Sequence, residues 1–109
     1  MQITETTQGA WTVLTLAGRI DHAGAEELKT ALMPRMTGGA VALDFTAVEY
    51  ITSFGFRALL MACKEQTAKQ GRFILGNMSQ PLRAYFDMAD LGAVLKIVPD
   101  IQAVIAQTP

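Results

Sequence analysis

The sequence predicts a single α/β domain with a mostly parallel central sheet of about five strands and about four helices. Short apolar segments alternate with amphipathic segments of helical length, and glycine or proline residues separate them. This alternation is typical of a sheet covered by helices, with right-handed connections between parallel strands. A chain of 109 residues, of which 50% are hydrophobic, is long enough for one core. We therefore expect one domain over residues 1–109.

The chain begins with a predicted β-hairpin. Residues 3–7 and 11–17 are typical of two strands, because apolar and polar side chains alternate in the second and Gln8-Gly9-Ala10 suits a turn between them. We expect residues 18–21 to leave the strand. The hairpin would make the first two strands of the sheet antiparallel.

A helix is predicted from Asp21 or His22 to about Met33, and a short strand follows it. The apolar side chains of the helix recur at helical spacing, at Ala25, Leu28 and Leu32. Pro34 and the glycine pair at 38–39 end the helix. Residues 40–45 are apolar throughout, as expected of a central parallel strand, and we expect a loop from there to Thr52.

The second half of the chain repeats the strand and helix pattern. Ser53 and Ser79 each precede an amphipathic segment and are expected to cap it. The expected elements are, in order, a helix over 53–70, a strand over 72–76, a helix over 79–91, a strand over 94–98 and a helix over 100–106.

The helix from Ser53 has apolar side chains on two opposite faces. At about 100° per residue, one continuous face is expected to contact the core and holds Phe56, Leu59, Leu60, Cys63 and Thr67. The opposite face holds Phe54, Ala58 and Met61. One interpretation is that Phe54 folds back on the preceding loop and Met61 touches a neighbouring helix. The other is that this face binds a partner protein.

The composition argues against several classes of protein. A net charge of −1 gives no cationic surface for a nucleic acid backbone, and no apolar run approaches the length of about 18 residues that a membrane span needs. One cysteine forms no internal disulfide, and the N-terminus lacks the features of a signal peptide. We expect a cytoplasmic protein that neither binds nucleic acid directly nor inserts into a membrane.

The side chains needed for catalysis or for a cofactor are scarce. The chain has one histidine, His22, and one cysteine, Cys63, which falls on the predicted core face. Asp44 and Glu49 lie near the end of a predicted strand without a companion base. No zinc set, glycine-rich nucleotide loop or Walker pattern is present. The sequence therefore favours a protein that is not an enzyme and has no metal or cofactor.

An ordered set of motifs resembles the STAS domain family of bacterial anti-sigma factor antagonists. The central motif is Tyr50-Ile51-Thr52-Ser53-Phe54-Gly55-Phe56-Arg57, preceded by a strand that ends Leu43-Asp44-Phe45. The family's glycine turn into its first helix resembles Gly18–Asp21, and its next strand resembles Gly71–Leu75. Its third helix and the turn after it resemble Ser79–Leu91. The resemblance runs nearly end to end and implies the STAS fold.

The resemblance also implies a phosphorylation switch. Family members bind a serine kinase that is also an anti-sigma factor and so release the sigma factor; the kinase phosphorylates a serine at a helix start, and a serine phosphatase reverses this. That serine corresponds to Ser53. The implied partner-binding residues are Asp21, His22, Thr52, Phe54, Arg57, Ala58 and Met61. The sequence leaves the formation of a homodimer open.

Two departures from the family pattern keep alternatives open. The family often has Asp-Ser-Ser-Gly or Asp-Ser-Thr-Gly where this chain has Thr52-Ser53-Phe54-Gly55, so an acid and a second hydroxyl are replaced. One alternative is a STAS docking subunit of a transporter or signalling complex that is never phosphorylated, with Ser53 only an N-cap. Another is a small-molecule or lipid-binding module with a pocket beside Phe54 and Met61.

Overall fold

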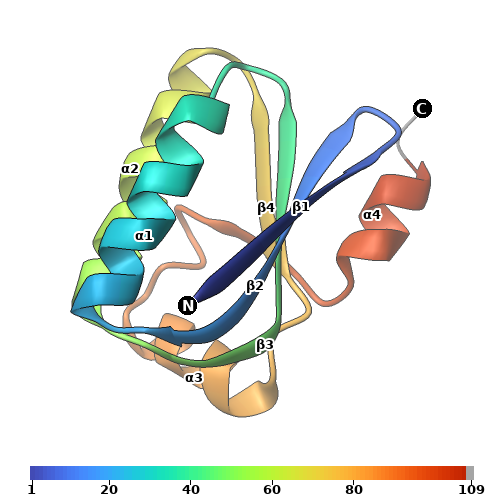
Figure 1. Ribbon diagram of the computed structural model, residues 1–109. Coiled ribbons are helices and arrows are strands. Elements are labelled where there is room, and N and C mark those ends of the chain that lie inside the picture. The colour runs from blue at the N-terminus through green and yellow to red at the C-terminus, as the bar shows by residue number, and fades with distance from the viewer. Residues whose placement is uncertain (108–109) are drawn as a thin grey trace.

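The computed structural model describes residues 1–107 and contains a five-stranded sheet with helices on both faces (Figure 1). The strands are β1 (Gln2–Gln8), β2 (Trp11–Ile20), β3 (Ala40–Ile51), β4 (Arg72–Gly76) and β5 (Lys96–Val98). The helices are α1 (His22–Leu32), α2 (Ser53–Ala68), α3 (Gln80–Met88) and α4 (Ile101–Gln107), with a 3₁₀ turn over Met33–Arg35. The predicted α/β class, with about five strands and four helices, is confirmed.

The strands follow one another across the sheet in chain order. β1 is antiparallel to β2, as expected of a hairpin, and the remaining neighbours are parallel. Figure 1 shows α1 and α2 side by side on one face, α4 on the opposite face and α3 near one end of the sheet. The sheet is therefore mixed, with its parallel part between β2 and β5.

The core lies on both faces of the sheet. The larger cluster joins the sheet to α1, α2 and α3, and the three apolar side chains predicted for the first helix, Ala25, Leu28 and Leu32, are buried in it. The smaller cluster lies under α4 around Trp11, Ile74 and Ile101. Because α4 has only seven residues, it covers less of its face than α1 and α2 cover of theirs.

β3 is longer than the sequence predicts. The expected loop between residue 45 and Thr52 is wrong, because the strand runs on to Ile51. The expectation that residues 18–21 leave the preceding strand is also wrong, since β2 continues to Ile20 beside β3. Thr15 pairs with Asp44 and Ala17 with Ala47, so β3 has one more residue than β2 in this interval, and the register shifts again between Gly18 and Arg19. These irregularities interrupt the alternation of buried and exposed side chains that identifies a strand in sequence.

Other boundaries differ by smaller amounts. The last strand, expected over 94–98, is limited to Lys96–Val98, because a hydrogen-bonded turn from Leu91 occupies the preceding residues. The hydroxyl of Ser79 accepts a hydrogen bond from the Leu82 N–H and caps α3, as predicted. Tyr85, on the same helix, is 40% exposed.

The buried face of α2 is rotated from the predicted one. Leu59 is buried as expected, but Phe56, Leu60 and Cys63 are only partly covered, and Thr67 is exposed. The residues of α2 that are fully buried are Gly55, Ala58, Leu59, Ala62 and Gln66. The rotation follows from the position of α2, which contacts α1 along its side as well as the sheet below.

Candidate functional site

The candidate site lies where α1 and α2 begin. Ile20 at the end of β2 pairs with Ile51 at the end of β3, and a helix starts just beyond each residue. The backbone N–H and the hydroxyl of Thr52 both donate to the Ile20 carbonyl, each at 3.0 Å. The Asp21 carboxylate accepts from the Gly24 N–H at 2.9 Å and caps α1. The ends of parallel strands thus bring Asp21, His22, Thr52 and Ser53 together, as the family resemblance implies.

Ser53 is the first residue of α2 and not its cap. The capping position belongs to Thr52, whose side chain makes no capping hydrogen bond, so the predicted role of Ser53 as N-cap is wrong. Ser53 is exposed, and its hydroxyl forms no hydrogen bond with any described residue. The first turn of α2 contains no acidic side chain. The hydroxyl is therefore free at the positive end of a helix dipole.

Phe54 and His22 form an aromatic pair that bridges the two helix starts. Their ring centroids are 4.4 Å apart, with an angle of 32° between the ring planes. Phe54 remains 45% exposed, and Met61, two turns further along α2, is 38% exposed. Phe54 therefore packs on the start of α1 and not on the segment that precedes it, as the first interpretation had it, and much of the residue stays accessible.

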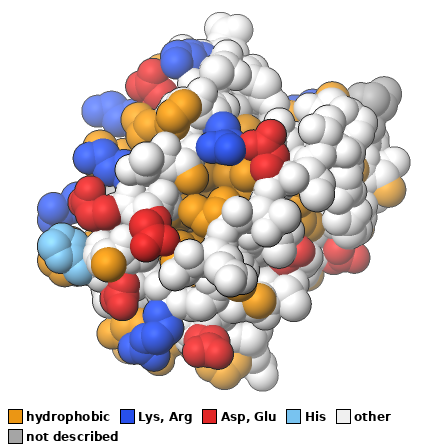
Figure 2. Space-filling model, viewed as in Figure 1, with side chains coloured by type: hydrophobic (Ala, Val, Ile, Leu, Met, Phe, Trp, Pro, Cys, Tyr) orange, Lys and Arg blue, Asp and Glu red, His pale blue; other side chains and the backbone are white. Residues whose placement is uncertain are grey.

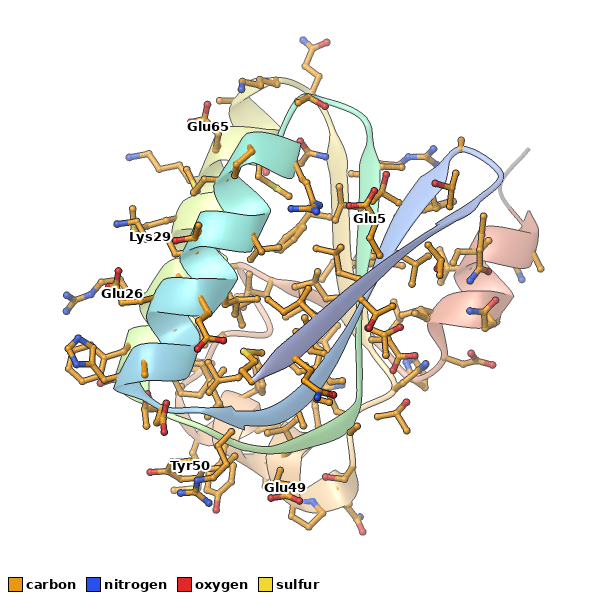
Figure 3. The ribbon with its side chains drawn as sticks, in the orientation of Figure 1. Glu5, Glu26, Lys29, Glu49, Tyr50 and Glu65 are labelled. Atoms are coloured by element: carbon orange, nitrogen blue, oxygen red, sulfur yellow. The ribbon has the colours of Figure 1, made fainter. Side chains whose placement is uncertain are left out.

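A shallow groove of about 130 Å³ runs between α1 and α2 next to this pair. Phe54, Arg57 and Met61 line it from α2, and Glu26 and Lys29 line it from α1. In Figure 2 the histidine lies against hydrophobic side chains, with charged side chains of both signs beside them. Figure 3 shows Glu26 and Lys29 projecting outward from α1. The groove has an apolar floor with a mixed-charge rim.

Ala58 does not belong to the exposed face. It is only 4% exposed, because α1 packs against α2 at this point, so its prediction as an accessible partner-binding residue is wrong. Its small side chain forms part of the floor of the groove. Of the predicted face, Phe54 and Met61 remain accessible, and Arg57 is exposed beside them.

Several residues at this end of the molecule are not identified by the sequence patterns. Arg19 lies over the ring of Tyr50, with 4.5 Å between its guanidinium carbon and the ring centroid. Tyr50 also contacts Tyr85 edge-on, with 6.1 Å between the two ring centroids. Tyr50 projects from the sheet end (Figure 3). Glu26 and Lys29 were also missed. Only their position could have identified them, because both are polar residues one or two turns into the helix that lies beside Ser53.

The isolated acids and the cysteine form no reactive cluster. The Asp44 carboxylate accepts hydrogen bonds from the Thr46 N–H and hydroxyl, which supports the irregular part of β3. Cys63, predicted to be buried, is half-buried and lines a cavity at the other end of α2. Over residues 1–107, no group of three or more His, Cys, Asp or Glu side chains could hold a metal ion, and no helix has the length and apolarity of a transmembrane span.

Comparison with known proteins identifies the family. The STAS domain model matches residues 2–104. A Bordetella bronchiseptica protein, BtrV, provisionally named an anti-sigma factor antagonist, is 26% identical over 96 residues, which cover 86% of this chain and 83% of the relative. The structure of unphosphorylated SpoIIAA, an anti-sigma factor antagonist, superposes with a TM-score of 0.73 at 25% identity, covering 94% of this chain and 91% of SpoIIAA.

A crystal structure of an anti-sigma factor antagonist from Mycobacterium paratuberculosis shares the fold at a TM-score of 0.85 with 19% identity, covering 96% of this chain and 91% of that one. The phosphorylated form of Bacillus SpoIIAA superposes at 0.69 with 24% identity, covering 98% of both chains. The family model covers nearly the whole sequence, and these structures share its sheet and helices. The chain belongs to the STAS domain family.

Proposed function

We propose that this chain is an anti-sigma factor antagonist that captures a serine kinase acting as an anti-sigma factor, and that phosphorylation of Ser53 ends this binding. Named relatives support the first part, since BtrV and SpoIIAA both carry the description of anti-sigma factor antagonist. SpoIIAA, moreover, has been described in phosphorylated and unphosphorylated forms. A serine phosphatase would restore the binding form.

The observation that carries the proposal is the free hydroxyl of Ser53 beside an accessible apolar face. Ser53 is exposed and has no hydrogen-bond partner among the described residues, so a kinase reaches it without breaking a contact of the fold. Phe54 and Met61 follow on the same helix and are partly exposed. A partner that covers these two side chains therefore also covers Ser53.

Phosphorylation would change the charge of the binding surface much more than the stability of the fold. A phosphate adds about 1.5 to 2 negative charges, which the N-terminus of a helix tolerates. Arg57, one turn further along α2 and exposed, is placed to pair with this charge. Inside an apolar interface the same anion must lose its water, and each 1.4 kcal/mol of that cost lowers affinity about tenfold.

Recovery of binding partners tests the capture step. We expect Phe54→Asp to weaken partner binding by about thirtyfold, because a charge replaces a large central side chain of the interface. Met88→Asp is the matched control, since Met88 is an exposed apolar residue on α3 with 84% exposure. Equal losses for the two variants, or none for Phe54→Asp, would show that the helix face is not the contact surface.

Thr52 favours a second candidate function, that of a docking subunit without phosphorylation. Threonine has no carboxylate that could orient Ser53 or a kinase. Its hydroxyl is also already engaged, because it donates to the Ile20 carbonyl. In that case the same face would bind its partner permanently. Failure of Ser53 to accept phosphate from a kinase that the chain captures would favour this function.

We propose a binding role rather than catalysis in both cases. The side chains gathered at the site are an aromatic pair, a methionine and charged residues on the rim, with no nucleophile placed beside a base. A partner protein fits this surface better than a substrate. The groove volume of about 130 Å³ is also small for a lipid or cofactor.

A further inference from the structure

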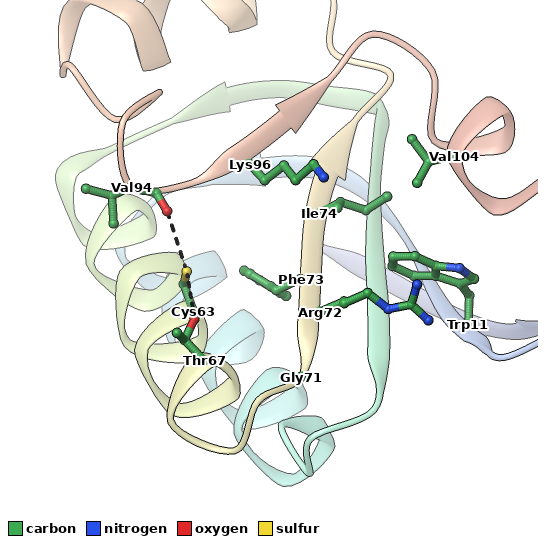
Figure 4. A pocket seen from close by; sticks show the side chains of 10 residues that line it. All are labelled: Trp11, Cys63, Thr67, Gly71, Arg72, Phe73, Ile74, Val94, Lys96 and Val104. Carbon is green, nitrogen blue, oxygen red and sulfur yellow. Dashed lines mark hydrogen bonds between the residues drawn. The ribbon is translucent and has the colours of Figure 1, made fainter. Parts of the chain in front are cut away.

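A second cavity lies at the opposite end of α2 from Ser53, at the edge of the sheet (Figure 4). Its volume is about 390 Å³, within the range of sites for small molecules. It is open because β5 has only three residues and pairs with Ile74, Leu75 and Gly76, which leaves the first residues of β4 without a strand on that side. Side chains from both faces of the sheet line the opening.

One wall of the cavity is cationic. Trp11, Ala40 and Arg72 are neighbours across three strands, and the small Ala40 lets Arg72 reach the indole, with 4.8 Å between the guanidinium carbon and the ring centroid. Lys96 pairs in register with Ile74 on the same face. Neither Arg72 nor Lys96 forms an ion pair with any described residue, and no acidic side chain lines the cavity. The two positive charges are therefore uncompensated.

The same wall contains an unused hydrogen-bond donor. Trp11 is only 2% exposed, and its Nε1 is the single buried side-chain nitrogen or oxygen of the described residues that has no hydrogen-bond partner. A buried donor without a partner costs about 1 to 3 kcal/mol. The indole ring forms part of the wall, and the cations beside it favour a ligand with negative charge.

The other wall is apolar. Phe73 and Val94 face the cavity on the side of α2, together with the half-buried Cys63. Val94 is 59% exposed, and a shallower hollow lined by Leu60 and Ala68 continues from this wall over α2. Figure 4 shows Phe73 and Arg72 on opposite sides of β4. A ligand in the opening therefore meets cations on one side and apolar surface on the other.

We propose that this cavity binds a small organic acid with an apolar body. Its carboxylate or other anionic head lies at Arg72 and Lys96 beside the Trp11 ring, and its body crosses the open edge of β4 to Phe73 and Val94. The site is separate from Ser53 and from the groove between α1 and α2, and the proposal does not depend on the function proposed above.

The test is a titration of the isotope-labelled full chain, followed by nuclear magnetic resonance. Trp11 is the only tryptophan, so its indole N–H gives one resonance that reports on the cavity. The probes are naphthoate, an aromatic carboxylate, and naphthamide, its uncharged analogue of the same shape. Lys96→Gln removes one cation from the cavity, and Arg83→Gln on α3, which lines neither the cavity nor the groove, is the control.

We expect naphthoate to shift the Trp11 indole resonance in a saturable manner and naphthamide to bind at least about tenfold more weakly. Lys96→Gln should weaken naphthoate binding by a similar factor, whereas Arg83→Gln should leave it unchanged. The amide spectrum of each variant reports whether it is folded. Absence of a saturable shift at Trp11, equal binding of the two probes, or wild-type binding by folded Lys96→Gln would overturn the proposal.

Discussion

Gln66 shows how one buried polar side chain holds α2 in place. It is fully buried, its Oε1 accepts from the Gly38 N–H at 2.9 Å, and its Nε2 donates to the carbonyls of Gly39 at 2.9 Å and Arg72 at 3.1 Å. These backbone groups precede β3 and begin β4. The carboxamide thus joins α2 to two strands, and every one of its polar atoms has a partner.

Replacement of this residue tests its role. Gln66→Leu removes the side-chain hydrogen bonds to the Gly38 N–H and to the carbonyls of Gly39 and Arg72, of which the Gly39 carbonyl still accepts from the Arg72 N–H. We expect the substitution to lower the free energy of unfolding by about 2 to 4 kcal/mol. Gln80→Leu, on the exposed first turn of α3, should change it by less than about 0.5 kcal/mol. Urea denaturation measures both. A Gln66→Leu protein as stable as the control would show that the carboxamide is dispensable.

At the scale of elements, the position of α2 depends on close contact with the ends of β2 and β3. A Cβ atom added to Gly55 would lie 2.7 Å from side-chain carbons of both Ile20 and Ile51. Glycine therefore lets the first turn of α2 approach the sheet. This approach holds Ser53 and Phe54 at the point where the two strands end.

We expect Gly55→Ala to destabilise the fold by about 1 to 3 kcal/mol and to displace the first turn of α2, because both isoleucines are in the packed core. Gly92→Ala is the matched control, since an added Cβ there meets no atom within 4 Å. Thermal unfolding and partner binding would report the two effects. Wild-type stability of Gly55→Ala would mean that the isoleucines move aside at little cost.

Sequence patterns predict buried positions well where the hydrophobic period is regular and poorly where it is broken. Residues with a regular period, such as Leu28 on α1, were placed correctly because one face alone is buried. The extension of β3 was missed because its extra residues break the period of two. The exposure of Ala58 was predicted wrongly because a helical wheel does not show that a second helix, α1, packs beside the first.

At the candidate site, sequence patterns identify side chains on one helix face but not contacts between distant residues. For Phe54 and Met61 the helical wheel leaves two interpretations open, and the structure shows both side chains partly exposed opposite the core face of α2. The pairing of His22 with Phe54 and the cavity beside Trp11 join residues far apart in sequence. The register of the strands brings such residues together, and this register cannot be predicted from the composition of single segments.

At the scale of the whole molecule, the proposed switch is expected to alter binding and leave the fold intact. Ser53→Asp adds a negative charge at the start of α2, where the helix dipole favours it, so the free energy of unfolding should change by less than about 1 kcal/mol. Partner affinity should fall by at least about tenfold, because the carboxylate is desolvated in the interface.

Ser79→Asp provides the control for this charge. Ser79 caps α3, and aspartate is an equally good N-cap, so this variant adds the same charge at another helix start and keeps the cap. Surface plasmon resonance or calorimetry with the captured partner would compare the two. Equal affinity of Ser53→Asp and Ser79→Asp would indicate that Ser53 lies outside the interface.

In the proposed switch, Ser53 accepts a phosphate that ends partner binding. The most direct measurement is mass spectrometry of the chain after incubation with ATP and the serine kinase that it captures, with Ser53→Ala treated in parallel. We expect one phosphate on the peptide that contains Ser53, none on the variant, and loss of the kinase complex as phosphate accumulates. A chain that remains bound to the active kinase without phosphate on Ser53 would contradict it.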